Sequence, residues 1–264
     1  NAVYWDNTEN AGGYKVRVKT PSGSVESYDA TVGAPHLSHA YLEAGMYEVS
    51  VSTISSEVGQ YDSEYSVPLY IQRLVAPKLT VNNSVVSNPN SYEDGFTVNF
   101  QAADGANRYN VYKEGVLIGS TQNLSFSVRD LLSENQSTGG EINYKIRSAG
   151  NVGGSTIKLD SLTSNATEFV VTVLPTPTDV RMDGSTVLWN ALSQTATTGY
   201  AVKTDAAVTT VQRNSHTLNS VAVGEHIISV CASGNGESII ASPYSTGIAV
   251  RKLSAPTDIR VDTS

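Results

Sequence analysis

The chain has 264 residues, of which 39% are apolar and 16% charged, and its formal net charge is −8. This apolar content is too high for a disordered chain, and a negative balance without a basic stripe argues against nucleic acid as a partner. No apolar run reaches the length of a membrane-spanning helix and no signal peptide is recognisable, so we expect no membrane insertion in this fragment. The single cysteine, Cys231, excludes an internal disulfide.

One short stretch of sequence recurs and divides the chain. Residues 174–183 return almost unchanged as residues 253–262, and a looser copy stands at 74–81. Pro77 and Pro177 are 100 residues apart, and Pro177 and Pro256 are 79 apart. A period of this size predicts an array of modules, each large enough to bury its own core. We therefore expect modules over residues 1–73, 74–173 and 174–252, with 253–264 as the first strand of a further module.

The first module is expected to begin at its second strand, so that its first strand is missing. Residues 3–5 predict a strand, and residues 6–13 a polar loop. Residues 14–19 then alternate apolar and charged, which places Tyr14, Val16 and Val18 on the buried face of a strand. Residues 47–51 alternate in the same way, and residues 65–71 predict a last strand.

The second and third modules repeat this order. Strands are expected at residues 96–100, 109–112, 126–128 and 144–147, and again at 187–189, 200–203 and 228–232. The extra length of the second module lies in residues 82–95 and 133–140, which have no period and predict loops. No segment has a helical period. Short strands separated by turn signals indicate an all-β sandwich.

Several residues recur at matching places and carry a resemblance to a known family. They are a proline before the first strand (Pro77, Pro177, Pro256), an aromatic residue on the second (Trp5, Phe100, Trp189), a tyrosine on the third (Tyr14, Tyr109, Tyr200), the corner residues Leu42, Gly45 and Tyr47, and the closing Ser-x-Tyr-Ser at 63–66 and 242–245. As a set they resemble the fibronectin type III superfamily, in the style of tandem modules of bacterial surface proteins and phage virion proteins. The resemblance covers essentially the whole chain and implies tandem immunoglobulin-like or fibronectin type III-like β-sandwiches.

Two departures concern the tyrosine corner. His226 stands at the corner position of the third module, and in the second the corner is stretched over residues 137–144. Both put the corner hydrogen bond in question but not the fold. We expect His226 to be a hydrogen-bonded replacement for tyrosine. We expect Trp189 and Tyr200 to fill the space between the two sheets of their module.

The sequence contains no convergent set of polar residues typical of an active site. His36 and His39 are three residues apart without an acidic or thiol partner nearby, so exposed loop histidines are favoured over a metal site. Cys231 falls one step off the inward set of its strand, which predicts an outward or half-covered thiol without a catalytic role. Neither the carboxylates of Glu93 and Asp94 nor the oxygen-rich loop 6–10 has the arrangement of a known site. We predict no catalytic, cofactor-binding or metal-binding residue, and no enzyme.

The tyrosines are unevenly distributed, because eight of the 14 lie in residues 1–73. The core pattern accounts for Tyr14, Tyr47 and Tyr65. It does not account for three others, Tyr28, Tyr41 and Tyr61. Exposed tyrosines stack on sugars or anchor protein partners, so these three are the candidate contact residues, with packing between modules as the alternative.

Two functional hypotheses follow. The first is a non-catalytic spacer array of an extracellular protein, on a bacterial cell surface or secreted, or of a virion fibre, which positions other domains and mediates adhesion. The alternative is a module that binds a carbohydrate or a protein through exposed tyrosines and the long loops of the second module. The expected partners are neighbouring modules, and a glycan or protein ligand. Head-to-tail self-association is a further expectation, in which residues 257–263 of one molecule complete the first module of the next.

Overall fold

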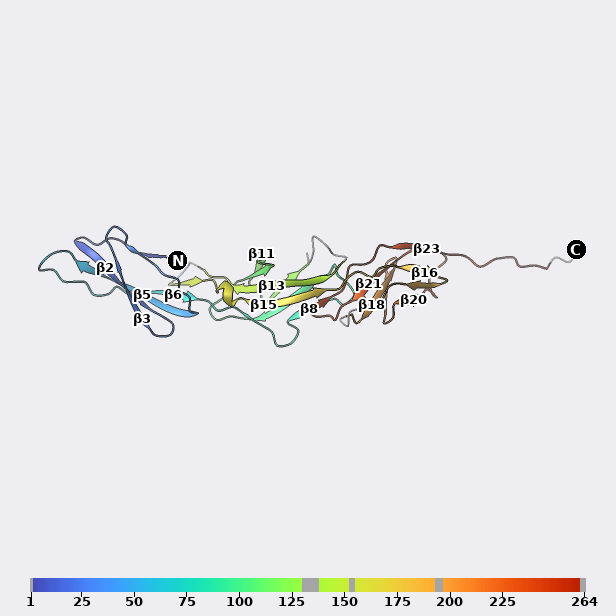
Figure 1. The fold of residues 1–264 in the computed structure, drawn as a ribbon, viewed down its shortest axis with the longest axis horizontal. Coiled ribbons are helices and arrows are strands. Elements are labelled where there is room, and N and C mark those ends of the chain that lie inside the picture. The colour runs from blue at the N-terminus through green and yellow to red at the C-terminus, as the bar shows by residue number, and fades with distance from the viewer. Residues whose placement is uncertain (1, 130–137, 152–154, 193–196, 262–264) are drawn as a thin grey trace. The chain divides into compact units, whose positions relative to one another are not determined.

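The computed structural model describes residues 2–129, 138–151, 155–192 and 197–261 (Figure 1). In these ranges the regular structure is β-strand, apart from one short 3₁₀ turn at Thr163–Asn165. No helix in the described part of the chain is long and apolar enough to span a bilayer. The six sheets pair face to face into three β-sandwiches, which confirms the predicted all-β fold class.

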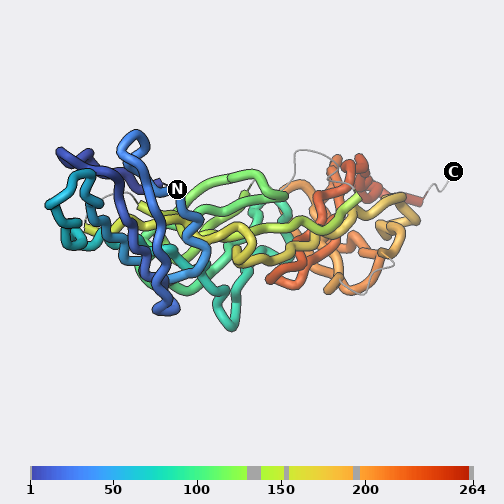
Figure 2. The backbone as a smooth tube through the Cα atoms, turned by 60° about the vertical axis from the view of Figure 1, so that its left-hand side comes forward, coloured from blue at the N-terminus to red at the C-terminus, as the bar shows by residue number. Residues whose placement is uncertain are grey.

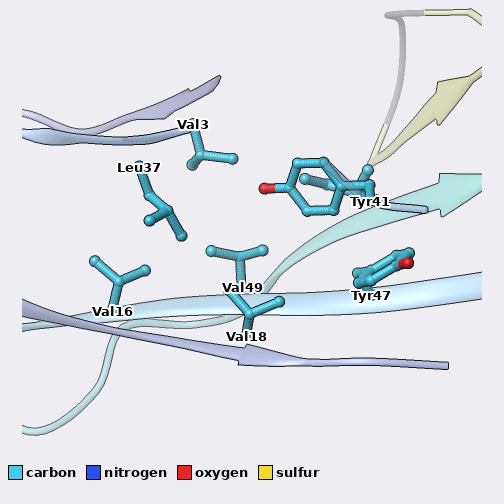
Figure 3. Close-up of a cluster of buried hydrophobic side chains, with 8 residues drawn as sticks. Val3, Val16, Val18, Leu37, Tyr41, Tyr47 and Val49 are labelled. Atoms are coloured by element: carbon cyan, nitrogen blue, oxygen red, sulfur yellow. The ribbon is translucent and has the colours of Figure 1, made fainter. Parts of the chain in front are cut away.

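The first sandwich has sheets of five strands and two strands. The larger has the order β14-β6-β5-β2-β3, and the smaller consists of β1 and β4. Their bounds are β1 Ala2–Tyr4, β2 Ala11–Lys19, β3 Val25–Ala30, β4 His36–Ser38, β5 Gly45–Ser55, β6 Leu69–Arg73 and β14 Thr156–Leu159. Val3 and Leu37 of the small sheet meet Val16, Val18 and Val49 of the large one (Figure 3). The predicted alternation of β2 is therefore confirmed.

The middle sandwich is built from β7 Lys78–Leu79, β8 Val85–Ser87, β9 Phe96–Gln101, β10 Tyr109–Lys113, β11 Val116–Thr121, β12 Ser125–Val128, β13 Gly140–Ser148 and β15 Thr167–Val173. One sheet has the order β12-β9-β7, with β8 also paired to β9, and the other includes β11-β10-β13-β15. Phe96 of the first sheet contacts Tyr144 and Phe169 of the second, with ring centroids 5.2 and 6.2 Å away. These aromatic contacts are part of its core, together with buried aliphatic residues of the same strands. The predicted loop 133–140 lies largely outside the described residues.

The third sandwich pairs a three-stranded sheet, β16-β17-β20, with a four-stranded one, β19-β18-β21-β23. The bounds are β16 Arg181–Asp183, β17 Thr186–Leu188, β18 Gly199–Thr204, β19 Ala207–Val211, β20 Ser215–Thr217, β21 Gly224–Ser233, β22 Ile239–Ile240 and β23 Ile248–Lys252. Val187 and Trp189 pack against Tyr200, Val202 and residues of β21 between the two sheets. Residues 253–261 form no strand, so their role as the first strand of another module stays a prediction.

Contacts between residues divide the chain into two compact units. One contains Asn1–Leu79, Phe100–Leu124 and Lys145–Glu168, and the other Thr80–Asn99, Ser125–Tyr144 and Phe169–Ser264. Strands β9, β13 and β15 each continue from one unit into the other. The module boundaries expected from the sequence are therefore not tested by this division and remain predictions.

An aromatic pair repeats in all three sandwiches, as expected. The ring centroids lie 5.5 Å apart for Trp5 and Tyr14, 4.9 Å for Phe100 and Tyr109, and 5.2 Å for Trp189 and Tyr200, each in an edge-on arrangement. The three tyrosine hydroxyls accept backbone N–H groups of the preceding loop, from Thr8, Ala103 and Leu192. Each tyrosine thus fills the core with its ring and fixes a loop with its hydroxyl.

The tyrosine corner is present in the first sandwich and is rebuilt with histidine in the third. Tyr47 Oη donates to the carbonyl of Glu43 at 3.1 Å and accepts from the Glu43 N–H at 2.7 Å. His226 Nε2 lies 3.0 Å from the carbonyl of Ala222, which is likewise four residues upstream. The prediction that His226 replaces the tyrosine by hydrogen bonding is confirmed.

One expectation about the first core is wrong, and it concerns Tyr65. At the corner, Leu42 is 64% exposed and the neighbouring Tyr41 is buried. Tyr65 is 36% exposed and lies under the Arg17 guanidinium, 4.5 Å from ring centroid to Cζ. The serines of the Ser-x-Tyr-Ser stretch explain its recurrence instead. The hydroxyls of Ser63 and Ser66 accept backbone N–H groups of β5, and those of Ser242 and Ser245 do the same for β21.

Candidate functional site at the joints between sandwiches

Each joint between successive sandwiches is made by strand addition. In immunoglobulin-like nomenclature the last two strands of a sandwich are F and G, and the loop between them is the F–G loop. The F–G loop of the middle sandwich contributes β14, which pairs in parallel with β6, the G strand of the first sandwich. The F–G loop of the third sandwich contributes β22, which pairs in parallel with β15, the G strand of the middle one. Both joints therefore use the same pair of structural elements.

In the first joint the pairing extends past the end of β6. The N–H of Leu74 donates to the carbonyl of Leu159 at 3.1 Å, and Leu74 is only 1% exposed. Ile157 and Leu159 pack against the core of the first sandwich, so the added strand contributes apolar contacts as well as backbone hydrogen bonds. Figure 2 shows the yellow-green part of the backbone that contains β14 beside the blue part of the first sandwich, in agreement with the pairing of β14 and β6.

Arg73 is a buried cation that ties three segments of the first joint together. Its guanidinium donates to the carbonyls of Tyr41 at 2.7 Å, Ala40 at 3.3 Å and Asp160 at 2.6 Å, and the residue is 8% exposed. Burial lowers the pKa of the Arg73 guanidinium and is the largest influence on that pKa. Three carbonyl dipoles compensate the loss of water around the charge, so the guanidinium joins the corner of the first sandwich to the next F–G loop.

The second joint repeats the first and adds a contact. The N–H of Leu174 donates to the carbonyl of Ile240 at 3.1 Å, as Leu74 does to Leu159. The long loop after β8 also reaches the third sandwich: the carbonyl of Pro89 accepts from the Gly234 N–H at 2.8 Å, and Asn90 Oδ1 accepts from Ser233 Oγ at 2.9 Å. This loop was a candidate for ligand binding, and part of it is occupied in packing between sandwiches.

A glycine in each F–G loop allows the added strand to form. A Cβ at Gly150 would lie 2.2 Å from the carbonyl oxygen of Lys158, and one at Gly234 would lie 2.1 Å from that of Ile239. Both separations are far below van der Waals contact. The loop can therefore fold back on itself only because these two positions lack a side chain.

The first sandwich has a different F–G loop. Ser55 stands where the glycine is found in the other two, since its N–H donates to Asp62 Oδ1 at 3.0 Å as the Gly150 N–H does to Asp160 Oδ1 at 2.7 Å. The loop between Ser56 and Asp62 contains no strand, and Val58 and Tyr61 in it are almost fully exposed.

The three candidate tyrosines lie in different environments. Tyr61 is 95% exposed, as expected. Tyr28 is half-buried, and its hydroxyl donates to the Glu26 carboxylate. That hydrogen bond lowers the pKa of Glu26 and raises the pKa of Tyr28. The expectation that Tyr41 is exposed is wrong, because it is fully buried between His39 and Tyr47 and burial raises its pKa to about 12.

His39 and Cys231 also differ from the prediction. His36 is exposed, but His39 is half-buried, with Nε2 3.1 Å from Glu26 Oε2 and Nδ1 accepting the Tyr41 N–H at 3.0 Å. Cys231 is fully buried, since Asn90 and Tyr244 cover it, and burial raises its pKa to about 11. Among the residues that the structure describes, no cluster of three metal-binding side chains is found.

Sequence reasoning missed the residues that make the joints. Gly150-Asn151 and Gly234-Asn235 occur at matching places after the F strand, and Ser161 and Ser242 close the two loops. Aligning the F–G loops with one another would have exposed this repeat. Arg73 gives no such signal, because a single arginine at the end of a strand is usual on a surface.

No family model and no curated protein sequence matches the chain. Among solved structures, the FN1–FN3 domains of chicken CNTN1 are similar over 96% of this chain and 94% of that chain, with 16% identity and a TM-score of 0.28. At this identity and TM-score the similarity adds nothing to the architecture described above.

Proposed function

We propose that this chain is a non-catalytic spacer array of an extracellular or virion fibre-like protein, which holds other domains at a set separation. The observation that supports the proposal is the repeated joint, in which each F–G loop adds a strand to the preceding sheet. Backbone hydrogen bonds and buried side chains replace a flexible linker there. An array with such joints resists bending, which is the property a spacer requires.

Small-angle scattering of the whole chain tests this proposal. A single compact globule of this length would have a radius of gyration of about 18 Å. We expect a clearly larger value and the pair-distance distribution of an elongated particle. Gly150→Ala and Gly234→Ala should each broaden the distribution, because the added Cβ displaces the paired strand.

Gly33→Ala is the matched control, since a Cβ at Gly33 meets no atom within 4 Å and should leave the scattering unchanged. A radius near that of a compact globule would contradict the proposal. Identical scattering from the wild type and both joint variants would contradict the role of the joints.

Adhesion is the second candidate function, and the exposed F–G loop of the first sandwich favours it. Tyr61 and Val58 offer an aromatic and an aliphatic side chain to a glycan or a protein surface. The test is binding of the whole chain to a glycan array and to cell-surface proteins. Tyr61→Ala should abolish the signal, whereas Tyr70→Ala, at a 40% exposed position on β6, should not. Equal signals from both variants would reject this site.

A further inference from the structure

The outer edge of β23 matches the edges that accept a strand at the two joints. β23 is the G strand of the third sandwich and lies at the end of its sheet, and no strand in the described part of the chain pairs with its other edge. Leu253 follows it as Leu174 follows β15, within the repeated stretch. At the second joint, Thr172 and Leu174 donate their N–H groups to Ser238 and Ile240. The matching donors here are Arg251 and Leu253.

The surroundings of this edge also repeat the first joint. Lys252 pairs with Gly224 as Arg73 pairs with Gly45, so the two cations occupy the same register position. Lys252 Nζ donates to the carbonyl of Val221 at 2.6 Å, as Arg73 donates to Tyr41. Arg73 then reaches the carbonyl of Asp160 on the next F–G loop, whereas Lys252 is exposed.

Apolar side chains are exposed at this end. Leu253 is 75% exposed, whereas Leu74, its counterpart in the first joint, is 1% exposed, and Val223 and Ile227 are 60% and 53% exposed. Beside them lies a cavity of about 260 Å³ lined by Met182, Leu218, Val221, His226 and Val250, among others. Apolar exposure next to an unpaired strand edge is a feature that proteins normally cover.

We propose that this end of the third sandwich is the docking surface for the F–G loop of a further sandwich, which adds a parallel strand to β23. The inference rests on the spacer function proposed above and names the partner that the array takes at this end. The partner loop has a glycine after its F strand and two apolar residues before its closing serine, as in Gly234, Ile239, Ile240 and Ser242. Residues 253–264 match residues 174–185 in sequence, the stretch with which the third sandwich begins.

A second copy of this chain is the other conceivable occupant, through the F–G loop of its first sandwich. That loop has Ser55 in place of the glycine, and the glycine position tolerates no Cβ at either joint. The loops of the other two sandwiches are already paired within their own chain. The structure therefore favours a further sandwich with the glycine.

The test uses an extended protein in which residues 1–264 are followed directly by a second copy of residues 186–252. In this protein, residues 253–264 are placed to serve as the first strand of the added sandwich. Hydrogen exchange at the Arg251 and Leu253 amides is compared with that in the original chain. We expect exchange to slow by about tenfold or more, because each amide gains a backbone hydrogen bond in a packed strand. Gly234→Ala in the added copy alone should return both amides to their original rates.

A second extended protein is used in case the first does not fold. It carries a copy of the middle sandwich, because residues 1–253 are followed directly by residues 75–173. The F–G loop of this sandwich contains Gly150 and Leu159. Protection of Leu253 in either extended chain supports the proposal. Fast exchange in both, with the added sandwich folded by its own amide protection, overturns it. Concentration-dependent protection in the original chain also overturns it, because the occupant is then a second copy. Scattering from the original chain tests the spacer function separately.

Discussion

Leu74 donates its backbone N–H to the carbonyl of Leu159, which belongs to the F–G loop of the next sandwich, at 3.1 Å. Leu174 repeats the relationship with Ile240 at the same distance. Both bonds follow the last strand of one sandwich and fix the chain just as it leaves that sandwich. At residues 74 and 174, the repeated stretch of sequence therefore begins with a hydrogen bond to the next F–G loop.

Arg73→Met should weaken the first joint. The guanidinium satisfies three carbonyls, and a thioether satisfies none of them. Hydrogen bonds to charged groups contribute about 1.5–3 kcal/mol each, although not additively. We expect the free energy of opening at the Leu74 amide, measured by hydrogen exchange, to fall by about 2 kcal/mol or more. Lys252→Met is the control, because Lys252 makes one exposed contact, and unchanged exchange at Leu74 in Arg73→Met would contradict this role.

Tyr41→Phe and Tyr47→Phe should have opposite effects on the first sandwich. The buried hydroxyl of Tyr41 has no hydrogen-bond partner among the described residues, so its removal should stabilise the fold by up to about 1 kcal/mol. Removing the Tyr47 hydroxyl breaks two bonds to Glu43 and should cost about 1–2 kcal/mol.

Denaturant unfolding followed by Trp5 fluorescence, in a Trp189→Phe background, measures both effects. Equal destabilisation by the two substitutions would show that the environment of Tyr41 is described wrongly.

His226 should make the third sandwich sensitive to pH. Its two imidazole nitrogens face Asp205 Oδ2 at 2.7 Å and the carbonyl of Ala222 at 3.0 Å. The hydrogen bond to the Asp205 carboxylate is the main cause of the raised pKa of His226. The positive charge of Lys252 acts against this increase. The contribution to stability is therefore fully present below pH 6.5 and is lost as the pH rises through the folded-state pKa.

Under acidic conditions, the pair of His226 and Asp205 makes stability depend on pH in the opposite direction. The bond to His226 lowers the pKa of Asp205, so that its contribution is present above pH 3.8 and is lost as the pH falls through the lowered value. His226→Tyr keeps a hydrogen-bonding group at the corner and does not titrate in this range. The midpoint temperature of thermal unfolding is measured by Trp189 fluorescence in a Trp5→Phe background. It should fall as the pH rises from 6 to 8.5 in the parent and should not fall in His226→Tyr. Parallel pH profiles would refute the assignment.

Trp189→Ala should destabilise the third sandwich by about 3–5 kcal/mol. The side chain is 1% exposed and packs edge-on against Tyr200 between the two sheets. Hydrogen exchange of β18 and β21 amides in the whole chain measures the loss. Met182→Ala, at a 37% exposed position on β16, should change the same amides by less than about 0.5 kcal/mol. A loss below 1 kcal/mol for Trp189→Ala would reject this core assignment.

The fold could be predicted from the sequence because alternating strands and a repeated aromatic pair can be recognised within short stretches of sequence. Tyr14, Val16 and Val18 are buried because they alternate on one strand, which a single sequence reveals. The burial of Tyr41 and Cys231 does not follow in this way. Tyr41 is enclosed by His39 and Tyr47 at a corner where the chain takes a positive φ of 46°, and Cys231 is covered by a loop of the preceding sandwich. Contacts between segments distant in sequence decide both.

Hydrogen exchange at the Leu74 and Leu174 amides of the whole chain measures whether the two joints are held by strand addition. If strand addition stiffens the joints, both amides are protected at a level comparable to the core strands. Gly150→Ala then releases Leu74 alone, and Gly234→Ala releases Leu174 alone. Exchange of either amide in the wild type at the rate of an unstructured peptide would contradict the account.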